Sequence, residues 1–319
     1  MYLEEARKKY AIDVPSDDIF YSQEYKIYFS KSTSETNEDL ERYRKFEEMY
    51  KKSFLVTFGG YTEKNIKTNN RTAVVLGGQT GAGKTGLVNL TNREALLQNS
   101  RYYLIDDDQY RKFYPRYDEI MVECPEYATI LTAIGSGPVT PKIMKYASDN
   151  GLNFIFDGTM KNTRIYETAQ KWEDYNVTYK VMATSRLESL LSIFERNAYL
   201  RRNGFGRPIS VEAHDETYNG LEDTIRTIEA NGSENIEIYM RGKNESSMPE
   251  LIYSPKQKGI YQSGVEALKS GRDRDKRRCM SQDIFARIAI LEASEIGLNS
   301  NESEELIKLK EALREEMER

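Results

Sequence analysis

The sequence predicts an α/β fold, in which a doubly wound parallel sheet carries flanking helices. From residue 70 onward, short apolar runs alternate with helical patterns, the order that builds right-handed βαβ units. A glycine-rich turn at 78–85 joins one apolar run directly to a helical pattern. In such sheets ligands bind where the carboxyl ends of the strands meet. The residues that follow each strand are therefore the first candidates for function.

The individual elements follow from these patterns. Strands are expected at five apolar runs: 72–76, 101–105, 152–156, 178–183 and 235–240. Helices are expected between and after them, at 84–98, 141–149, 163–175, 187–202 and 211–230. This alternation indicates that consecutive strands are parallel and that the helices cover the sheet.

The two ends of the chain lack this alternation. We expect residues 1–69 to form an N-terminal extension that is helical or irregular, with one charged helix at 38–52. Residues 70–255 would form the core, and 256–319 would form C-terminal helices. The last helix is expected at 302–319, with one apolar face made by Leu306, Leu309 and Leu313. Such a face is typical of a helix that packs along one edge, and a partner-binding helix is the alternative.

Composition excludes several function classes. The net charge is 46 − 51 = −5, and an acidic chain is not typical of nucleic-acid binding proteins. The chain has two cysteines, Cys124 and Cys279, and no C-x-x-C spacing, which indicates a reducing cytoplasmic compartment. We find no run of transmembrane length and no signal-peptide pattern, so no membrane association is expected. Because His214 is the single histidine, catalysis would depend on carboxylates, lysine, arginine and a bound metal.

The turn at 78–85 fits the phosphate-binding motif G-x-x-x-x-G-K-[ST] at every fixed position. Its residues are Gly78, Gln79, Thr80, Gly81, Ala82, Gly83, Lys84 and Thr85. Glycines allow backbone N–H groups to surround phosphates, and the following helix N-terminus favours negative charge. Lys84 would then reach the β- and γ-phosphates of ATP, and the Thr85 hydroxyl would ligate Mg²⁺. We call residues 78–85 the P-loop.

Acidic residues follow two of the expected strands. Asp106, Asp107 and Asp108 come after the second strand, where an acid would assist Mg²⁺ or accept a proton from a substrate hydroxyl. The alternative is an N-cap of a helical turn at 109–113, and we expect one of the three to have that role. Asp157 follows the third strand and precedes Thr159. It would bind a substrate or position the P-loop, unless it caps the next helix.

Arginines cluster at the end of the helix expected at 187–202. Arg196 and Arg207, separated by a glycine-containing loop, are interpreted as a lid that grips phosphoryl oxygens. Arg201 and Arg202 are interpreted as a solvated helix end. His214 is expected to be structural or a helix cap, and Trp172 is expected in the core.

The residues named so far resemble one family. Gly77–Thr85, Ile105–Asp108, Phe156–Thr159, Phe194–Arg196 and the segment from Arg207 to Ala213-His214-Asp215 are together similar to the zeta toxin family. These proteins are P-loop kinases of bacterial toxin–antitoxin systems. The resemblance covers residues 70–245. It implies a P-loop kinase-like fold and a kinase that uses ATP and Mg²⁺.

The resemblance also implies roles for individual residues. Family members phosphorylate the 3′-hydroxyl of UDP-N-acetylglucosamine, which blocks cell-wall synthesis. By that pattern Asp108 is the general base on the sugar hydroxyl, and Lys84 and Thr85 hold phosphate and metal. Asp157 and Thr159, with Asp106, are assigned to the substrate side. Arg196 and Arg207 are assigned to the transferred phosphoryl group.

The chain departs from the family pattern mainly on the acceptor side. Thr80 replaces a proline of the loop, Asp157 replaces a glutamate, and Pro141 stands where a glutamate often contacts the sugar nucleotide. Other acceptor hydroxyls, such as that of a nicotinamide dinucleotide, therefore stay open. A kinase of nucleic-acid ends and a nucleotide-gated binding module are the rival functions.

The N-terminal extension raises the question of a partner. In toxin–antitoxin pairs of this family an antitoxin helix blocks the ATP site. Residues 1–69 would either do so in cis or pack against the rest of the protein, and packing is the expectation.

Overall fold

The computed structural model describes residues 1–14, 20–22, 27–29, 37–59, 70–202, 211–232, 235–242, 248–256, 259–281, 284–293, 298 and 300–317. The chain divides into two compact units. The first consists of Met1–Arg71 and Tyr102–Phe156, and the second of Thr72–Arg101 and Asp157–Arg319.

Six strands form the main sheet, in the order β4-β5-β3-β6-β7-β8. They are β3 (Arg71–Gly77), β4 (Tyr103–Asp106), β5 (Phe154–Asp157), β6 (Tyr175–Met182), β7 (Ile236–Met240) and β8 (Glu250–Tyr253). The first five are the strands expected from the sequence. The α/β class and the parallel character of the sheet are confirmed, because β6 and β7 pair in parallel.

The strand β8 was not expected from the sequence. It pairs antiparallel with β7, and the register shifts between Ile238 and Tyr239. Its four residues include an exposed glutamate at the start, so the run is too short and too polar to stand out as a buried strand. The sheet is therefore mixed, with parallel pairing dominant and one antiparallel edge strand.

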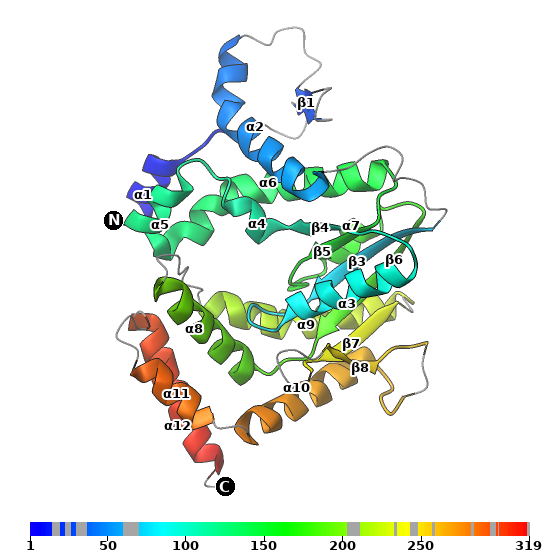
Figure 1. The fold of residues 1–319 in the computed structure, drawn as a ribbon, viewed down its shortest axis with the longest axis vertical. Coiled ribbons are helices and arrows are strands. Elements are labelled where there is room, and N and C mark those ends of the chain that lie inside the picture. Colours follow the sequence, from blue (N-terminus) through cyan, green and yellow to red (C-terminus); the bar gives the residue numbers. More distant parts are fainter. Residues whose placement is uncertain are drawn as a thin grey trace. The chain divides into compact units, whose positions relative to one another are not determined.

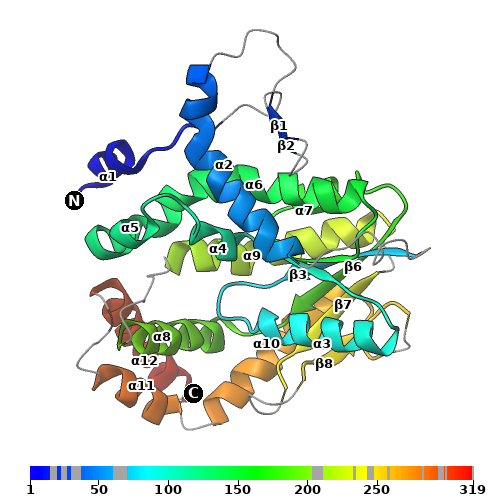
Figure 2. The same ribbon diagram turned by 45° about the horizontal axis from the view of Figure 1, so that its top comes forward.

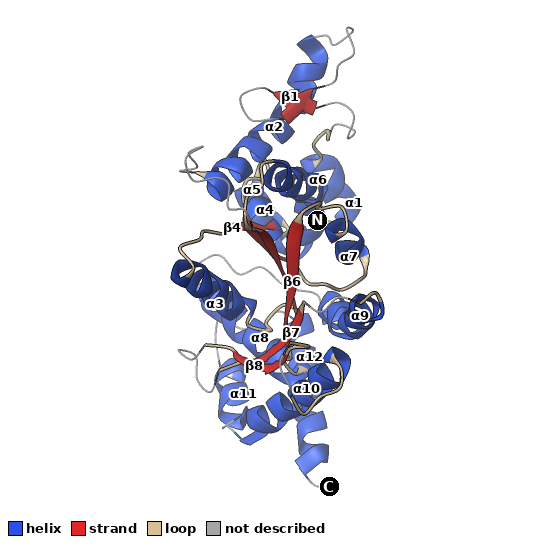
Figure 3. Cartoon of the chain, turned by 90° about the vertical axis from the view of Figure 1, so that its right-hand side faces the viewer, coloured by secondary structure: helices blue, strands red, loops and turns tan. Residues whose placement is uncertain are grey.

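In the second unit, helices cover both faces of the strands. Figure 3 shows α3 and α9 on opposite sides of β6 and β7. The helices of this unit are α3 (Lys84–Leu97), α7 (Arg164–Ala169), α8 (Arg186–Arg202), α9 (Val211–Ala230), α10 (Gly264–Ser281), α11 (Ile284–Glu292) and α12 (Ser300–Met317). The expected bounds of α9 are met at both ends. The helix expected at 163–175 ends early at Ala169, since the β-forming residues from Tyr175 onward belong to β6.

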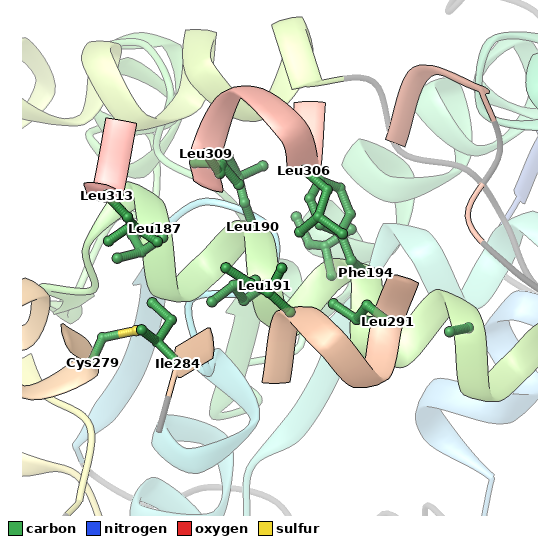
Figure 4. Packing of buried hydrophobic residues seen from close by; sticks show 13 residues of the cluster. Leu187, Leu190, Leu191, Phe194, Cys279, Ile284, Leu291, Leu306, Leu309 and Leu313 are labelled. Carbon is green, nitrogen blue, oxygen red and sulfur yellow. The ribbon is translucent and has the colours of Figure 1, made fainter. Parts of the chain in front are cut away.

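The C-terminal helices pack on α8 through a buried apolar cluster (Figure 4). Leu190, Leu191 and Phe194 of α8 are at most 1% exposed, and they meet side chains of α11 and α12. The apolar face predicted for the last helix is confirmed, because its three leucines are buried in this cluster: Leu306, Leu309 and Leu313.

The first unit is mainly helical apart from β4, most of β5 and one small pair of strands (Figure 1). Its elements are α1 (Leu3–Tyr10), α2 (Asn37–Phe58), α4 (Asp107–Arg111), α5 (Tyr117–Glu123), a 3₁₀ turn (Pro125–Tyr127) and α6 (Ala128–Asp149). A small antiparallel pair, β1 (Phe20–Ser22) and β2 (Ile27–Phe29), was not expected. The helix α6 begins 13 residues before the predicted start at 141, although Pro138 and Pro141 lie inside it. Burial of one face, including Leu131 and Val139, outweighs the two prolines.

The N-terminal helix α2 packs against α6 within this unit, and Figure 2 shows the two helices crossing. The ring centroids of Phe54 and Phe58 lie 4.7 Å and 5.1 Å from that of Tyr146. The Thr57 hydroxyl lies 2.7 Å from the Tyr110 hydroxyl. Residues of the N-terminal extension thus form part of the core of the first unit. The predicted functional division at 69/70 and 255/256 stays a prediction.

No candidate for a membrane-spanning helix is found among the residues that the structure describes.

Candidate functional site

The P-loop joins β3 to α3 in the second unit, and three of its glycines have positive φ. Gly78 has φ 142°, Gly81 has φ 78° and Gly83, the N-cap of α3, has φ 92°. Residues with a Cβ rarely adopt such angles. A Cβ at Gly81 would also collide with the backbone oxygen of Ser189. The glycines of the motif are therefore required by this backbone path.

Several P-loop carbonyl oxygens accept hydrogen bonds from the protein. Thr184, just after β6, donates its hydroxyl to the Ala82 carbonyl at 2.7 Å. Arg241, just after β7, donates Nε to the same oxygen at 3.2 Å and its Nη2 to the Gly81 carbonyl. Lys84 Nζ lies 3.1 Å from the Gly78 carbonyl. With these oxygens occupied, the loop and the first turn of α3 have the form that is typical of an anion site.

Gln79 holds the P-loop from inside the protein. Its side chain is fully buried, and Nε2 donates to the Thr184 carbonyl at 2.9 Å and to Ser189 Oγ at 3.1 Å. The Gln79 side chain therefore fixes the loop to the start of α8, and the predicted role of Gln79 in ATP binding is left to its backbone. Thr80 is half-buried, and Thr85 is exposed in the first turn of α3.

Asp157 and Thr159, predicted for the substrate side, lie beside the P-loop in the same unit. Asp157 Oδ1 is 3.9 Å from Lys84 Nζ, and the Gly78 N–H donates to the Thr159 carbonyl at 3.2 Å. The Asp157 carboxylate does not cap a helix: α7 begins at Arg164, and its N-cap is Thr163. The structure thus brings together Lys84, Asp157 and Thr159.

The acidic run Asp106–Asp108 lies at the end of β4 in the first unit. Asp106 is the N-cap of α4, since its Oδ1 accepts the Asp108 N–H at 3.0 Å and the Gln109 N–H at 3.4 Å. The expectation that one of the three acids is a cap is confirmed. Asp107 accepts from Arg111 at 2.6 Å and from the Thr140 hydroxyl at 2.9 Å.

Asp108 is the most solvent-accessible of the acids in this cluster. Its side chain is 61% exposed, compared with 29% for Asp107. Arg111 Nε lies 3.0 Å from Asp108 Oδ1. Of the two carboxylates that face Arg111, Asp108 is thus the one more open to a molecule from solution.

The predicted arginine lid is only partly within the described residues. Arg196 is exposed on α8, next to Glu195, whose carboxylate is bonded to Arg287 at 2.7 Å. Arg207 lies outside the described residues, and so do the side chains of Arg201 and Arg202. Their roles stay predictions.

His214 and Trp172 have the structural roles expected of them. His214 is buried, with Nε2 2.9 Å from Ser189 Oγ and Nδ1 2.9 Å from Asp215 Oδ1. Burial lowers the pKa of His214 below its ordinary value, although Asp215 opposes this shift. Ser189 in turn accepts a hydrogen bond from the Gln79 side chain, so His214 supports the P-loop indirectly through Ser189 and Gln79. Trp172 is 7% exposed.

Arg241 was not among the residues predicted for the site. This residue follows β7, and its guanidinium contacts both the P-loop and Glu188 of α8, the latter at 2.7 Å. The same rule that selected Asp106 and Asp157, a charged residue directly after a buried strand, would have found it.

The residues fit ATP and Mg²⁺ in chemical terms. The loop supplies glycine backbone and Lys84 for phosphates, and Thr85 supplies an exposed hydroxyl oxygen. Among the described residues no cluster of three or more His, Cys, Asp or Glu forms a protein cage for a metal. Mg²⁺ bound with ATP takes most of its ligands from phosphates and water, so one protein hydroxyl is compatible with it.

Comparison with known proteins agrees with this geometry. The model of the zeta toxin family matches residues 60–249, which is more than half of the chain. The chain belongs to the zeta toxin family. The match includes the P-loop, the acidic run and α8, and ends before α10, α11 and α12.

Relatives and solved structures extend this result. Toxin zeta of Streptococcus agalactiae is 28% identical over 211 residues, which are 61% of this chain and 72% of the relative. Toxin PezT of Streptococcus pneumoniae serotype 4 is 29% identical over 178 residues, 54% of this chain and 69% of the relative. A chain from the characterised PezAT toxin–antitoxin system of S. pneumoniae superposes with a TM-score of 0.64 at 22% identity, covering 82% of this chain and all of that one. The superposition shows that this zeta toxin family member has the same P-loop kinase-like fold.

Proposed function

We propose that this zeta toxin family member is an ATP- and Mg²⁺-dependent kinase that transfers the γ-phosphoryl group of ATP to a hydroxyl of a small molecule. The observation that carries this proposal is the P-loop itself. Its Gly81 and Ala82 carbonyls accept hydrogen bonds from Arg241 and Thr184, respectively. Lys84 Nζ lies 3.9 Å from Asp157 Oδ1. This arrangement favours binding of a triphosphate over any neutral ligand.

On the donor side, the protein's contribution is positioning and charge. N–H groups of the P-loop and of the first turn of α3 would hold the β- and γ-phosphates, and Lys84 would neutralise charge that develops during transfer. Mg²⁺, held by Thr85 and the phosphates, would supply further positive charge there. Arg196 and Arg207 are proposed to grip the transferred phosphoryl group, because guanidinium groups bind phosphoryl oxygens in pairs of hydrogen bonds.

On the acceptor side, Asp108 is proposed as the general base. The carboxylate would take the proton of the acceptor hydroxyl as its oxygen bonds to the γ-phosphorus and the bond to ADP breaks. The exposure of its side chain, 61%, supports this choice over Asp107, which is bonded to both Arg111 and Thr140. Asp157, Thr159 and Asp106 are proposed to contact the substrate.

The acceptor proposed first is UDP-N-acetylglucosamine at its 3′-hydroxyl, by resemblance to the family. The alternatives are another nucleotide or dinucleotide hydroxyl, including an NAD-type acceptor, and nucleic-acid ends. A purified preparation incubated with Mg·ATP and a panel of nucleotide sugars, dinucleotides and 5′-hydroxyl oligonucleotides would distinguish them by a mass gain of one phosphate. The Lys84→Ala protein is the matched control. ATP consumption without any phosphorylated acceptor would instead support a nucleotide-gated binding module.

A toxin of this kind is proposed to have an antitoxin protein as its partner, as the S. pneumoniae relative does in its toxin–antitoxin system. Inhibition in cis by the N-terminal helix α2 is the alternative. Deleting residues 1–60 would not test it cleanly, because Phe46, Met49 and Tyr50 are buried in the first unit. Leu55 and Val56 are 56% and 41% exposed, so Leu55→Asp and Val56→Asp alter the outer face of α2 without opening that core. Higher kinase activity in these variants would establish inhibition in cis, and unchanged activity would exclude this face from it.

A further inference from the structure

Three charged side chains connect the C-terminal helices to the P-loop. Arg287 of α11 donates to Glu188 at 2.8 Å, and Glu188 accepts from Arg241 Nη1 at 2.7 Å. Arg241 then donates to the carbonyls of Gly81 and Ala82. We call Arg287, Glu188 and Arg241 the relay. All three residues belong to the second unit.

The bond from Arg241 to the loop has a directional consequence. A trans peptide unit is planar, with its carbonyl and the following N–H pointing in opposite directions. Fixing the Ala82 carbonyl on Arg241 therefore turns the Gly83 N–H away from Arg241. Gly83 is in the left-handed region and has no Cβ, so its own conformational preference does not fix this orientation. An external contact such as Arg241 is needed to do so.

The relay is held firmly at its far end. Arg287 also binds Glu195 in a two-pronged pair, with Nε–Oε1 at 2.7 Å and Nη2–Oε2 at 2.8 Å. Burial raises the pKa of Glu188, but hydrogen bonds from Arg287 and Cys279 and the charges of Arg241 and Arg287 outweigh it, so the pKa is lowered. Glu188 therefore carries its charge between two guanidinium groups. With the Arg287 charge removed, Glu188 would keep one ionic partner in place of two.

Arg287 lies beyond the stretch matched by the family model, which ends at residue 249. Its helix α11 packs on α8 through the cluster of Figure 4, with Ile284 and Leu291 at most 4% exposed. This packing sets the position of Arg287 relative to Glu188. The C-terminal helices are thus connected to the P-loop backbone through the side chains of the relay, without a contact to the nucleotide.

We infer that Arg241 and Arg287 are positioning residues for phosphate binding: Arg287 fixes Glu188, Glu188 fixes Arg241, and Arg241 fixes the peptide units of the P-loop. The inference rests on the proposed function for its effect on ATP. Its effect on the loop itself does not depend on which ligand the loop binds.

The test compares Arg241→Met and Arg287→Met with a matched control, Arg272→Met. Arg272 is a buried arginine of the same unit, 4% exposed, which donates to the Tyr218 carbonyl at 2.7 Å rather than to the loop. A fourth variant, Arg241→Lys, keeps the charge but lacks the planar fork that reaches several acceptors. It serves as the readout if Arg241→Met fails to fold. Each protein is measured by hydrogen exchange of a peptide spanning 78–87 and by titration with Mg·ATP.

In Arg241→Met we expect exchange in this peptide to rise about tenfold and the Kd for Mg·ATP to rise about tenfold, because a hydrogen bond to a charged donor is lost at each carbonyl. Arg241→Lys should give a smaller rise in both, about threefold. Arg287→Met should give about a threefold rise in both, and Arg272→Met should change neither beyond its general loss of stability. If the residues act in series, adding Arg287→Met to Arg241→Met should have little further effect.

Two results would overturn the inference. One is loop exchange in Arg241→Met and Arg287→Met no faster than in Arg272→Met. The other is full additivity of the two relay variants, which would mean that each acts alone. A wild-type protein that does not bind Mg·ATP would refute the proposed function, and loop exchange would still decide whether the relay positions the loop.

Discussion

The two strand ends that carry the candidate site residues are supported in different ways. At the end of β3, the P-loop is held by residues distant in sequence, since Thr184 and Arg241 lie 102 and 159 residues from Ala82. At the end of β4, the acidic run is held by residues that are closer in the sequence. Arg111 is four residues and Thr140 is 33 residues from Asp107. The two strand ends also differ in the exposure of their side chains, since Lys84 is 15% exposed and Asp108 is 61% exposed.

This difference indicates that the P-loop, the proposed donor side, is fixed, whereas the segment around Asp108, the proposed acceptor side, is adaptable. A backbone cradle held by tertiary contacts is set before a nucleotide arrives, which favours phosphate binding without reorganisation. An exposed carboxylate in the first turn of a short helix is less restricted by packing than a buried one, even when it pairs with an arginine as Asp108 does. Selectivity for the proposed triphosphate donor is therefore expected to depend on the P-loop backbone, and selectivity for the acceptor on side chains that a substrate orders.

The largest effect is expected at the fixed side. Lys84→Ala should abolish phosphoryl transfer, by about 10³-fold or more, and weaken ATP binding, because its charge acts on the phosphates themselves. Direct titration with Mg·ATP and a transfer assay measure the two effects separately. Unchanged ATP affinity would contradict the assignment of 78–85 as the nucleotide site.

At the adaptable side, Asp108→Asn should lower transfer by about 10²- to 10⁴-fold while leaving ATP affinity nearly unchanged. The amide keeps the size of the side chain and one acceptor oxygen but does not take up the proton. Turnover at the wild-type rate in this variant would rule out Asp108 as the base.

Asp107→Asn is the matched control, because Asp107 stands next to Asp108 and contacts the same arginine. Its bonds to Arg111 and Thr140 make it a structural residue, so we expect about a tenfold loss of transfer at most, together with a lower melting temperature. If Asp107→Asn proved the more damaging to transfer, with stability intact, the roles of the two acids would be reversed.

The sequence predicted the parts of this molecule that depend on local pattern. Five strands of the main sheet and helix α9 were located because their apolar residues recur with the period of their element. The P-loop was identified because its backbone path needs positive φ angles, which glycine adopts readily in any fold. The positive φ values of Gly78, Gly81 and Gly83 confirm this.

What the sequence did not predict depends on contacts between distant segments. The prolines of α6 suggested a later start for this helix, and burial of its apolar face decided otherwise. The charge directly after an expected strand marks Arg241 as a candidate, but its contact with the P-loop exists only because β7 ends near that loop in the folded second unit. The partition of the acids after β4 into a cap, a partly buried ion pair and an exposed carboxylate likewise depends on the folded structure.

The smallest effect, a pH dependence of stability and of Mg·ATP binding, is expected at His214, which reaches the P-loop only through Ser189 and Gln79. Because the pKa of the folded state is lowered by burial below the ordinary 6.5, the unfolded chain binds more protons between the two values. The stability contributed by neutral His214 is therefore complete above pH 6.5 and is lost as the pH falls from 6.5 toward the folded-state pKa. Asp215, Arg186 and Arg272 are the charged groups that act on this titration. The pKa of Asp215 is lowered below 3.8 by hydrogen bonds from Arg186 and His214, despite burial, so its own contribution is lost only in more acidic solution.

Urea unfolding of the wild-type protein and of His214→Gln at pH 7.5 and pH 5.5 tests this sign. The wild-type midpoint should be lower at pH 5.5, and the variant should lose part of that dependence, because glutamine does not titrate. Since Ser189 links His214 to Gln79, the wild-type protein should also bind Mg·ATP more weakly at pH 5.5, and His214→Gln should show less of this change. An equal decline of the midpoint in both proteins would contradict the titration of His214, and an equal decline of Mg·ATP affinity would remove His214 from the support of the P-loop. The fixed character of the donor side would then depend on the contacts of Arg241 and Thr184.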